Sequence, residues 1–263
     1  MTLFFFEVVL GLIIHTLTGY IQSIYLIQEK ERLLLLDGCC YCDFERVKQF
    51  IEIELQLELK NLELVITTHA HPDHMGALKR FKKHGIPIAG PEGINIWYKG
   101  PVGIATYIVD ILLTHFVARA QKKKFKRVLF SRKIELDYIL KDGSQVPGFN
   151  NWKVIESPGH TSMDLTLYHT KEEIAYVADN ILSSQTKIFS PYPICFPELY
   201  KASLQKYLDL GITEYLLAHH NRMTISKAEV QDLIAKTPSK PKKHSNMSFQ
   251  ILKKILNHTI SKK

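Results

Sequence analysis

The stretch THAHPDHMG, residues 68–76, places three histidines and one aspartate within six positions, directly after the apolar run LELVIT at residues 62–67. An apolar run of this length before a polar loop is typical of a buried strand. In an extended segment, residues two apart point the same way, so His69 and His71 can reach one metal ion. The stretch therefore predicts a metal-binding loop at the end of a strand.

The second half of the stretch turns from an extended segment into a helix. Asp73 and His74 lie at this turn, where they can serve a second ion. Pro72 stiffens the crossing, and Gly76 allows the start of the helix to approach its neighbours closely. Each zinc ion needs roughly three protein ligands besides an open or shared solvent position. Four ligands are too few for two ions, so we expect others from elsewhere in the chain.

Three more candidate ligands stand at the ends of apolar strands. His160 follows WKVIESPG, His219 follows EYLLA, and Asp179 ends EIAYVAD. Open α/β sheets usually collect functional groups at such strand ends. A buried strand has little reason to end in an unpaired carboxylate, so Asp179 is expected to face a cation. Four other histidines suit surface or core roles better: His84, His169, His244 and His258.

The composition describes one ordinary globular domain. The chain has 263 residues, 46% of them hydrophobic, with neither a linker nor a repeat of the kind that builds solenoids or propellers. Three of its four cysteines are crowded as CCYC at 39–42, unlike the spaced set of a secreted disulfide scaffold, and Cys195 alone cannot complete a thiolate metal site. We expect free thiols and a cytoplasmic location.

The two ends of the chain differ in character. The apolar residues 1–17 contain Glu7 and show neither a positive leader nor a small-residue cleavage site, so they predict a strand pair that enters the core. Residues 236–263 hold eight lysines and no acid, which accounts for the whole formal charge of +8. We therefore divide the chain into a domain at 1–235 and a basic tail at 236–263 that carries a short amphipathic helix.

Helices and strands alternate along most of the domain, which indicates an α/β architecture with layered sheets. Helical periodicity marks residues 43–55, 74–85 and 200–211. Strands are expected at 20–28, 32–38, 61–70, 86–91, 152–157, 164–170, 173–179 and 214–220.

A mostly helical, apolar insertion at residues 94–140 interrupts this alternation. Within 100–120 only Asp110, His115 and Arg119 break the apolar run, and five basic residues follow by position 127. A helix that is apolar nearly all round must be buried against something. A lid over a lipophilic substrate or a homodimer contact is favoured over a membrane-surface element. A membrane span is not expected, because Asp110 would lie near its middle.

The order HAHPDH, PGHT, AD and then a strand that ends in histidine resembles the metallo-β-lactamase superfamily of metallohydrolases, over residues 1 to about 225. The H-x-H-x-D-H motif is highly specific for it. LLLLDG, with Asp37, also matches the acidic turn that this family places under its metal loop. The resemblance implies a four-layered αβ/βα sandwich, to which the helical insertion is an addition.

The resemblance also implies a ligand set for two divalent ions. One ion would be held by His69, His71 and His160, a second by Asp73, His74 and His219, with Asp179 as the bridge. The family usually places a glycine on each side of the last histidine. Here Ala218 and His220 flank His219, so His220 is the alternative; His219 is favoured because it comes first after the strand. Histidine and carboxylate ligands suit Zn²⁺, while Fe and Mn remain open.

The expected chemistry is hydrolysis. Two ions that share a water lower its pKa toward 7 and give a metal-bridged hydroxide, and Asp73 is the expected proton relay. An Asp rather than a Cys at Asp179 is similar to the glyoxalase II, lactonase and RNase Z side of the family, so antibiotic hydrolysis is not expected. We predict that a small-molecule ester, thioester or lactone, with a lipophilic portion, is the substrate.

Alternative functions remain open at this point. One is phosphodiester cleavage with the same metals, and another is a non-hydrolytic role. Nucleic acid is not expected as a partner, because the lysines concentrate in the tail and no basic residues interleave with aromatic ones. Peripheral membrane contact through 101–127 or the tail, and a homodimer, also stay open.

Overall fold

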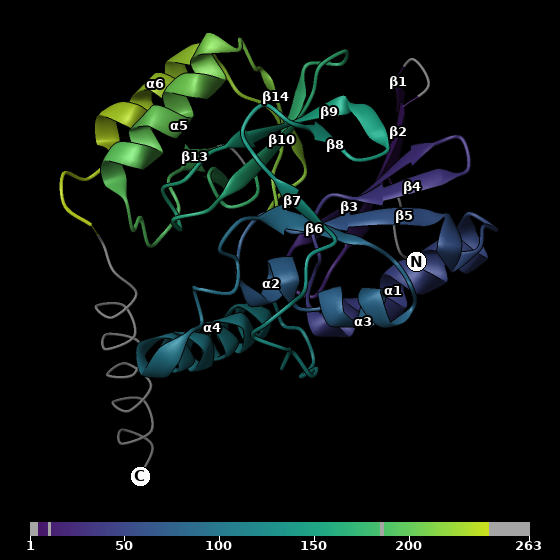
Figure 1. The fold of residues 1–263 in the computed structure, drawn as a ribbon. Coiled ribbons are helices and arrows are strands. Elements are labelled where there is room, and N and C mark those ends of the chain that lie inside the picture. Colours follow the sequence, from purple (N-terminus) through teal and green to yellow (C-terminus); the bar gives the residue numbers. More distant parts are fainter. Residues whose placement is uncertain (1–4, 10–11, 185–186, 242–263) are drawn as a thin grey trace.

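Two β-sheets pack face to face, and helices cover the outer side of each, in the computed structural model of this chain (Figure 1). The structure describes residues 5–9, 12–184 and 187–241. The layered αβ/βα sandwich that the sequence predicts is thus confirmed. The predicted helix within the tail lies outside the described residues.

The first sheet has seven strands in the order of the chain. The first four are antiparallel neighbours, and β4 to β7 run parallel. Parallel neighbours end at the same edge, so the turns after β4 and β5 lie together. The strands are β1 (Phe5–Val9), β2 (Leu12–Thr18), β3 (Ser23–Glu29), β4 (Arg32–Leu35), β5 (Leu62–Ile66), β6 (Ile88–Pro91) and β7 (Tyr138–Leu140).

The second sheet has six strands in the order β15-β14-β11-β10-β9-β8, and β12 and β13 form a separate ribbon. β11 and β14 are parallel neighbours, so the residues that follow them leave the sheet at one edge. The strands are β8 (Gln145–Val146), β9 (Phe149–Glu156), β10 (Leu165–His169), β11 (Ile174–Tyr176), β12 (Leu182–Ser183), β13 (Ile188–Phe189), β14 (Glu214–Leu216) and β15 (Arg222–Thr224).

Short helices connect the strands, and three longer ones lie at the periphery (Figure 1). The α-helices are α1 (Phe44–Gln49), α2 (Pro72–Met75), α3 (Leu78–Lys83), α4 (Gly100–Ala120), α5 (Pro197–Asp209) and α6 (Lys227–Lys236). Single turns of 3-10 helix occupy Tyr41–Asp43 and Leu59–Asn61, and a π-helical turn, Phe50–Glu54, extends α1.

Strand β3 shows why the central segments are apolar without alternation. Tyr25 and Ile27 belong to the core between the two sheets, where Trp152 also lies. Ile24 and Leu26 point to the opposite side and pack with α1 and α3. Side chains of a strand alternate between its two faces, so a strand with both faces covered is apolar throughout. The outer face of the second sheet packs in the same way against α5 and α6.

The insertion is less helical than its composition predicts. Helix α4 covers Gly100–Ala120, but residues 121–137 form an irregular return to the edge strand β7. Side-chain hydrogen bonds replace helical ones there: the Tyr107 hydroxyl donates to the Phe130 carbonyl. Among the described residues, α4 is the one helix long and apolar enough to cross a membrane.

The predicted strand pair near the N-terminus is confirmed as β1 and β2, which are antiparallel.

All four cysteines are free thiols, and Cys39 and Cys40 are buried.

Candidate metal centre

The stretch 68–76 forms the crossing from β5 into α2. Pro72 is the first residue of α2, where its missing N–H costs nothing. Gly76 lies against the turn that follows β4: an added Cβ would meet the Tyr41 nitrogen at 2.7 Å and the Cys39 oxygen at 2.9 Å. Only glycine permits this approach, as the sequence indicates.

Three separate loops bring the remaining candidates to the same edge of the sandwich. His160 follows β9, Asp179 follows β11 and His219 follows β14. The structure thus gathers all seven predicted residues, in two groups whose potential ligand atoms lie within 4.8 Å of one another. Of the seven, six are buried and His219 is half-buried.

The first group comprises three histidines and one oxygen of Asp179. His71 Nδ1 lies 3.0 Å from His69 Nε2 and 3.1 Å from His160 Nε2. Asp179 Oδ2 lies 3.4 Å from His160 Nε2 and 3.7 Å from His69 Nε2. Ligand atoms about 2.1 Å from a tetrahedral ion are roughly 3.4 Å apart. The spacing fits one such ion.

The second group uses the other oxygen of the same carboxylate. Asp179 Oδ1 lies 3.3 Å from His74 Nε2 and 3.2 Å from His219 Nε2. Asp73 Oδ2 lies 3.4 Å and 3.3 Å from these same nitrogens. Asp179 therefore presents one oxygen to each group, which is the geometry of a bridging ligand. Within the described chain, the buried atoms His74 Nε2 and Asp179 Oδ1 make no hydrogen bond, which agrees with a role as metal ligands.

The geometry favours His219 over His220 as the last member. The His219 ring enters the second group, whereas His220 contributes its backbone carbonyl to a hydrogen bond from the Tyr25 hydroxyl. The residue nearer to the strand end thus faces the cluster.

Asp37, in the turn after β4, orients two of the histidines. Its carboxylate lies 2.6 Å from His74 Nδ1 and accepts hydrogen bonds from the Thr68 hydroxyl at 2.7 Å and the Tyr176 hydroxyl at 2.9 Å. The Thr68 oxygen in turn lies 3.0 Å from His69 Nδ1. A ring that donates through Nδ1 keeps the Nε2 lone pair free, so both rings can present Nε2 to an ion.

A second buried carboxylate shapes the loop of His160. Asp164 accepts hydrogen bonds from the Gly159 nitrogen at 3.0 Å and the Thr161 nitrogen at 2.7 Å. His160 Nδ1 lies 2.9 Å from the Pro193 carbonyl, which directs Nε2 to the first group. An added Cβ at Gly159 would lie 2.5 Å from Tyr200 Cβ, so this loop also requires glycine.

Sequence reasoning missed two residues that contact the cluster. Asp110 of α4 is buried, accepts a hydrogen bond from the Tyr98 hydroxyl at 2.9 Å, and lies 3.9 Å from His71 Nε2. Burial raises its pKa to about 6, against the opposing effect of His71. The Gln22 amide donates to the Asp73 carbonyl. The signal in the sequence for Asp110 is a lone acid in an apolar helix, and that signal predicts only that the helix does not span a membrane.

The two buried carboxylates of the cluster favour positive charge beside them. Burial raises the pKa of Asp179, but the neighbouring His74 and His219 lower it well below its usual range. The pKa of Asp73 is raised by burial and lowered well below its usual range by the same two histidines. Burial lowers the pKa of His219, yet the two carboxylates raise it to about 10, whereas burial takes that of His69 down to about 3. Bound divalent cations would supply this charge and displace the protons.

A cavity of about 330 Å³ opens onto both groups. Leu113 and Val117 of α4, Ile21, Leu182 and Tyr192 form much of its wall. Among the described residues that line it there is neither a lysine nor an arginine. The cavity thus combines an apolar wall with the His/Asp cluster at its base.

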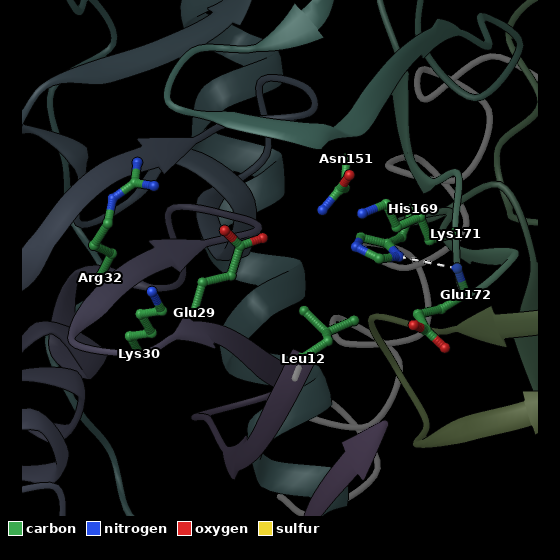
Figure 2. Close-up of a pocket in the computed structure, with 8 residues that line it drawn as sticks. All are labelled: Leu12, Glu29, Lys30, Arg32, Asn151, His169, Lys171 and Glu172. Carbon is green, nitrogen blue, oxygen red and sulfur yellow. Dashed lines mark hydrogen bonds between the residues drawn. The ribbon is translucent and has the colours of Figure 1, made fainter. Parts of the chain in front are cut away.

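A second hollow, of about 390 Å³, lies elsewhere on the surface (Figure 2). Charged side chains of both signs line it, among them Glu29, Arg32 and Lys171. His169 accepts a hydrogen bond from the Glu172 nitrogen and packs on the Trp152 ring, which agrees with the surface or core role predicted for it. No group of potential metal ligands includes these residues in the described chain.

Comparisons with known proteins give one consistent result. A sequence model of the Metallo-beta-lactamase superfamily matches residues 17–219. The "Probable metallo-hydrolase YqjP" of Bacillus subtilis (strain 168) is 23% identical over 142 residues, which are 50% of this chain and 44% of that protein. The match thus spans less than half of that relative.

Two solved structures show the same fold at low identity. The metallo-beta-lactamase family protein TTHA1429 from Thermus thermophilus has a TM-score of 0.63 and 17% identity, over 81% of this chain and 73% of that one. The metallo-beta-lactamase from Pontibacter korlensis has a TM-score of 0.59 and 13% identity, over 90% and 100%.

Proposed function

Because this chain belongs to the metallo-beta-lactamase superfamily, we propose that it is a binuclear metal-dependent hydrolase of an ester, thioester or lactone with an apolar acyl portion. The observation that carries the substrate class is the cavity above the cluster. Its wall is apolar, and no lysine or arginine lies among the described lining residues. A nucleic acid carries further charged phosphates beside the scissile one, and the described wall offers them no cationic side chain, so a neutral acyl compound fits better.

The donor set supports two ions, one in each group. Its five imidazoles and two carboxylates suit Zn²⁺, with Fe or Mn as alternatives. When bound, such a pair supplies Lewis acidity, which lowers the pKa of water at the site and polarises the substrate carbonyl. The free thiols of the chain support a reducing, cytoplasmic location.

The side chains of the cavity and the cluster have separate roles in this function. Leu113 and Val117 hold the acyl portion and exclude water from the cluster. Asp73 lines the same cavity and its carboxylate faces His74 and His219, so it lies where it can take up the proton released during hydrolysis. Asp37 orients the His74 ring, and Asp164 fixes the loop that carries His160.

A substrate comparison tests this function. We expect the purified protein to hydrolyse acyl thioesters and lactones, and to prefer a long acyl chain over an acetyl group. The double variant Leu113→Ala/Val117→Ala should raise KM for the long-chain thioester roughly tenfold, because it removes apolar contacts, and leave the acetyl substrate nearly unchanged. Ile53→Ala, at an exposed position outside the cavity, is the matched control.

Steady-state kinetics with both thioesters and a bis-phosphodiester reporter provide the measurement. Faster cleavage of the phosphodiester would replace the acyl proposal with a nuclease or phosphodiesterase function. Absence of turnover on every substrate, in protein that retains two metals, would contradict hydrolysis of these classes.

A further inference from the structure

Helix α4 has an apolar side that no other part of the described chain covers. Its inner side is anchored: Asp110, Ile111, Thr114 and Ala118 are buried. Its outer side shows an apolar residue at every fourth position, and these side chains are 42% to 54% exposed: Ile104, Ile108, Leu112 and Phe116. Residues four apart lie on one face of a helix, so they form a continuous stripe. The sequence predicts that this apolar helix is buried against something, and within the described chain only its inner side is.

A basic segment continues from the end of the stripe. Lys122, Lys123 and Lys124 are exposed and form no ion pair within the described residues, and Phe125 beside them is 81% exposed. The segment is held in place: the Lys123 nitrogen donates to the Ala118 carbonyl at 2.8 Å, and the Phe125 ring stacks on His115 at 4.6 Å. No acid occurs between Asp110 and Glu135. We call the stripe, Phe125 and these three lysines the docking face.

We propose that the docking face binds the surface of a membrane that contains anionic lipid. An interfacial helix of this kind lies in the plane of the membrane, with apolar side chains in the acyl boundary and lysines near the headgroups. Each lysine close to an anionic surface strengthens binding roughly fivefold. The exposed Phe125 between basic residues fits the same boundary.

The structure argues against three other occupants. If α4 crossed a membrane, Asp110 would lose its contacts with Tyr98 and with His71 of the His/Asp cluster. A second copy that docks with the same face offers no counter-charge, because the one acid of α4 is the buried Asp110. A nucleic acid finds phosphate partners in the lysines but none along the stripe.

The same helix links the docking face to the cavity. Leu113 and Val117 line the cavity, while their neighbours Leu112 and Phe116 face outward. A lipophilic substrate in the membrane would therefore lie next to the cavity wall. This connection rests on the proposed acyl hydrolase function, whereas docking itself does not.

Cosedimentation of the full chain with lipid vesicles tests the docking. The protein should bind phosphatidylcholine vesicles that contain phosphatidylglycerol, and bind vesicles of phosphatidylcholine alone much more weakly. The triple variant Lys122→Glu/Lys123→Glu/Lys124→Glu should lower the partition coefficient on the order of 100-fold or more. Leu112→Ser/Phe116→Ser should lower it roughly tenfold. Bound metal and circular dichroism should match the unsubstituted protein, because all five positions face outward.

Matched controls carry the same changes elsewhere. Lys141→Glu/Lys153→Glu/Lys171→Glu alters the charge equally on exposed positions around the second sheet, and Ile53→Ser removes another exposed apolar side chain. Both should bind vesicles nearly as well as the unsubstituted protein. Equal loss in the controls, or no loss in the docking-face variants, would overturn the proposal. So would a dimer in solution that Leu112→Ser/Phe116→Ser dissociates, without any vesicle binding.

Discussion

Replacing Asp179 with alanine is expected to lower the affinity for both ions by at least about 100-fold and to abolish hydrolysis. One oxygen of this carboxylate lies 3.2 Å from His219 Nε2, and the other lies 3.4 Å from His160 Nε2. Asp179 belongs to the first group by its Oδ2, and its Oδ1 reaches His74 and His219 of the second. Metal content after dialysis, measured by plasma emission spectroscopy, gives the result directly.

The control for this change is Asp232→Ala. Asp232 is exposed on α6, where its ion pair with Lys236 is of the surface kind that contributes little to stability. That variant should keep its full metal content and activity. An Asp179→Ala protein that still holds two ions per chain would show that the bridging assignment is wrong.

Replacing Asp73 with asparagine is expected to lower kcat on the order of 1000-fold, in line with loss of a proton acceptor. Asparagine keeps an oxygen where Asp73 Oδ2 faces His74 and His219, but it cannot take up a proton. Asp73→Ala, which removes the oxygen as well, should abolish hydrolysis and also weaken the second ion.

Parallel kinetic and metal measurements separate the two roles of Asp73. In Asp73→Asn, metal content should fall much less than kcat. Near-normal turnover by either variant, with full metal content, would exclude Asp73 from proton transfer.

The residues of the cluster could be predicted from the sequence because they follow apolar strands. The carboxyl ends of β11 and β14 are adjacent, since Tyr176 pairs in parallel with Leu216, and this register carries Asp179 and His219 to one edge. For the three members that follow β9, β11 and β14, the visible sign is a polar side chain within four positions of the end of a buried strand. The choice between His219 and His220 needed the structure, because it depends on which ring turns toward the cluster.

The parts that sequence reasoning missed depend on long-range packing. Asp110 approaches His71 only because α4 folds back over the end of the sandwich, and spacing along the chain does not reveal this. The irregular course of 121–137 likewise depends on contacts with α4. Helix α6 is a different case: Ser226 and Glu229 form a capping box that marks its start, and this local signal is present in the sequence itself.

The metal content of the purified full chain tests the central claim most directly. The account predicts two divalent ions per chain after gel filtration, loss of both with a strong chelator, and recovery of both when Zn²⁺ is returned. Less than one ion per chain, before chelation and after incubation with Zn²⁺, Fe²⁺ or Mn²⁺, would contradict it.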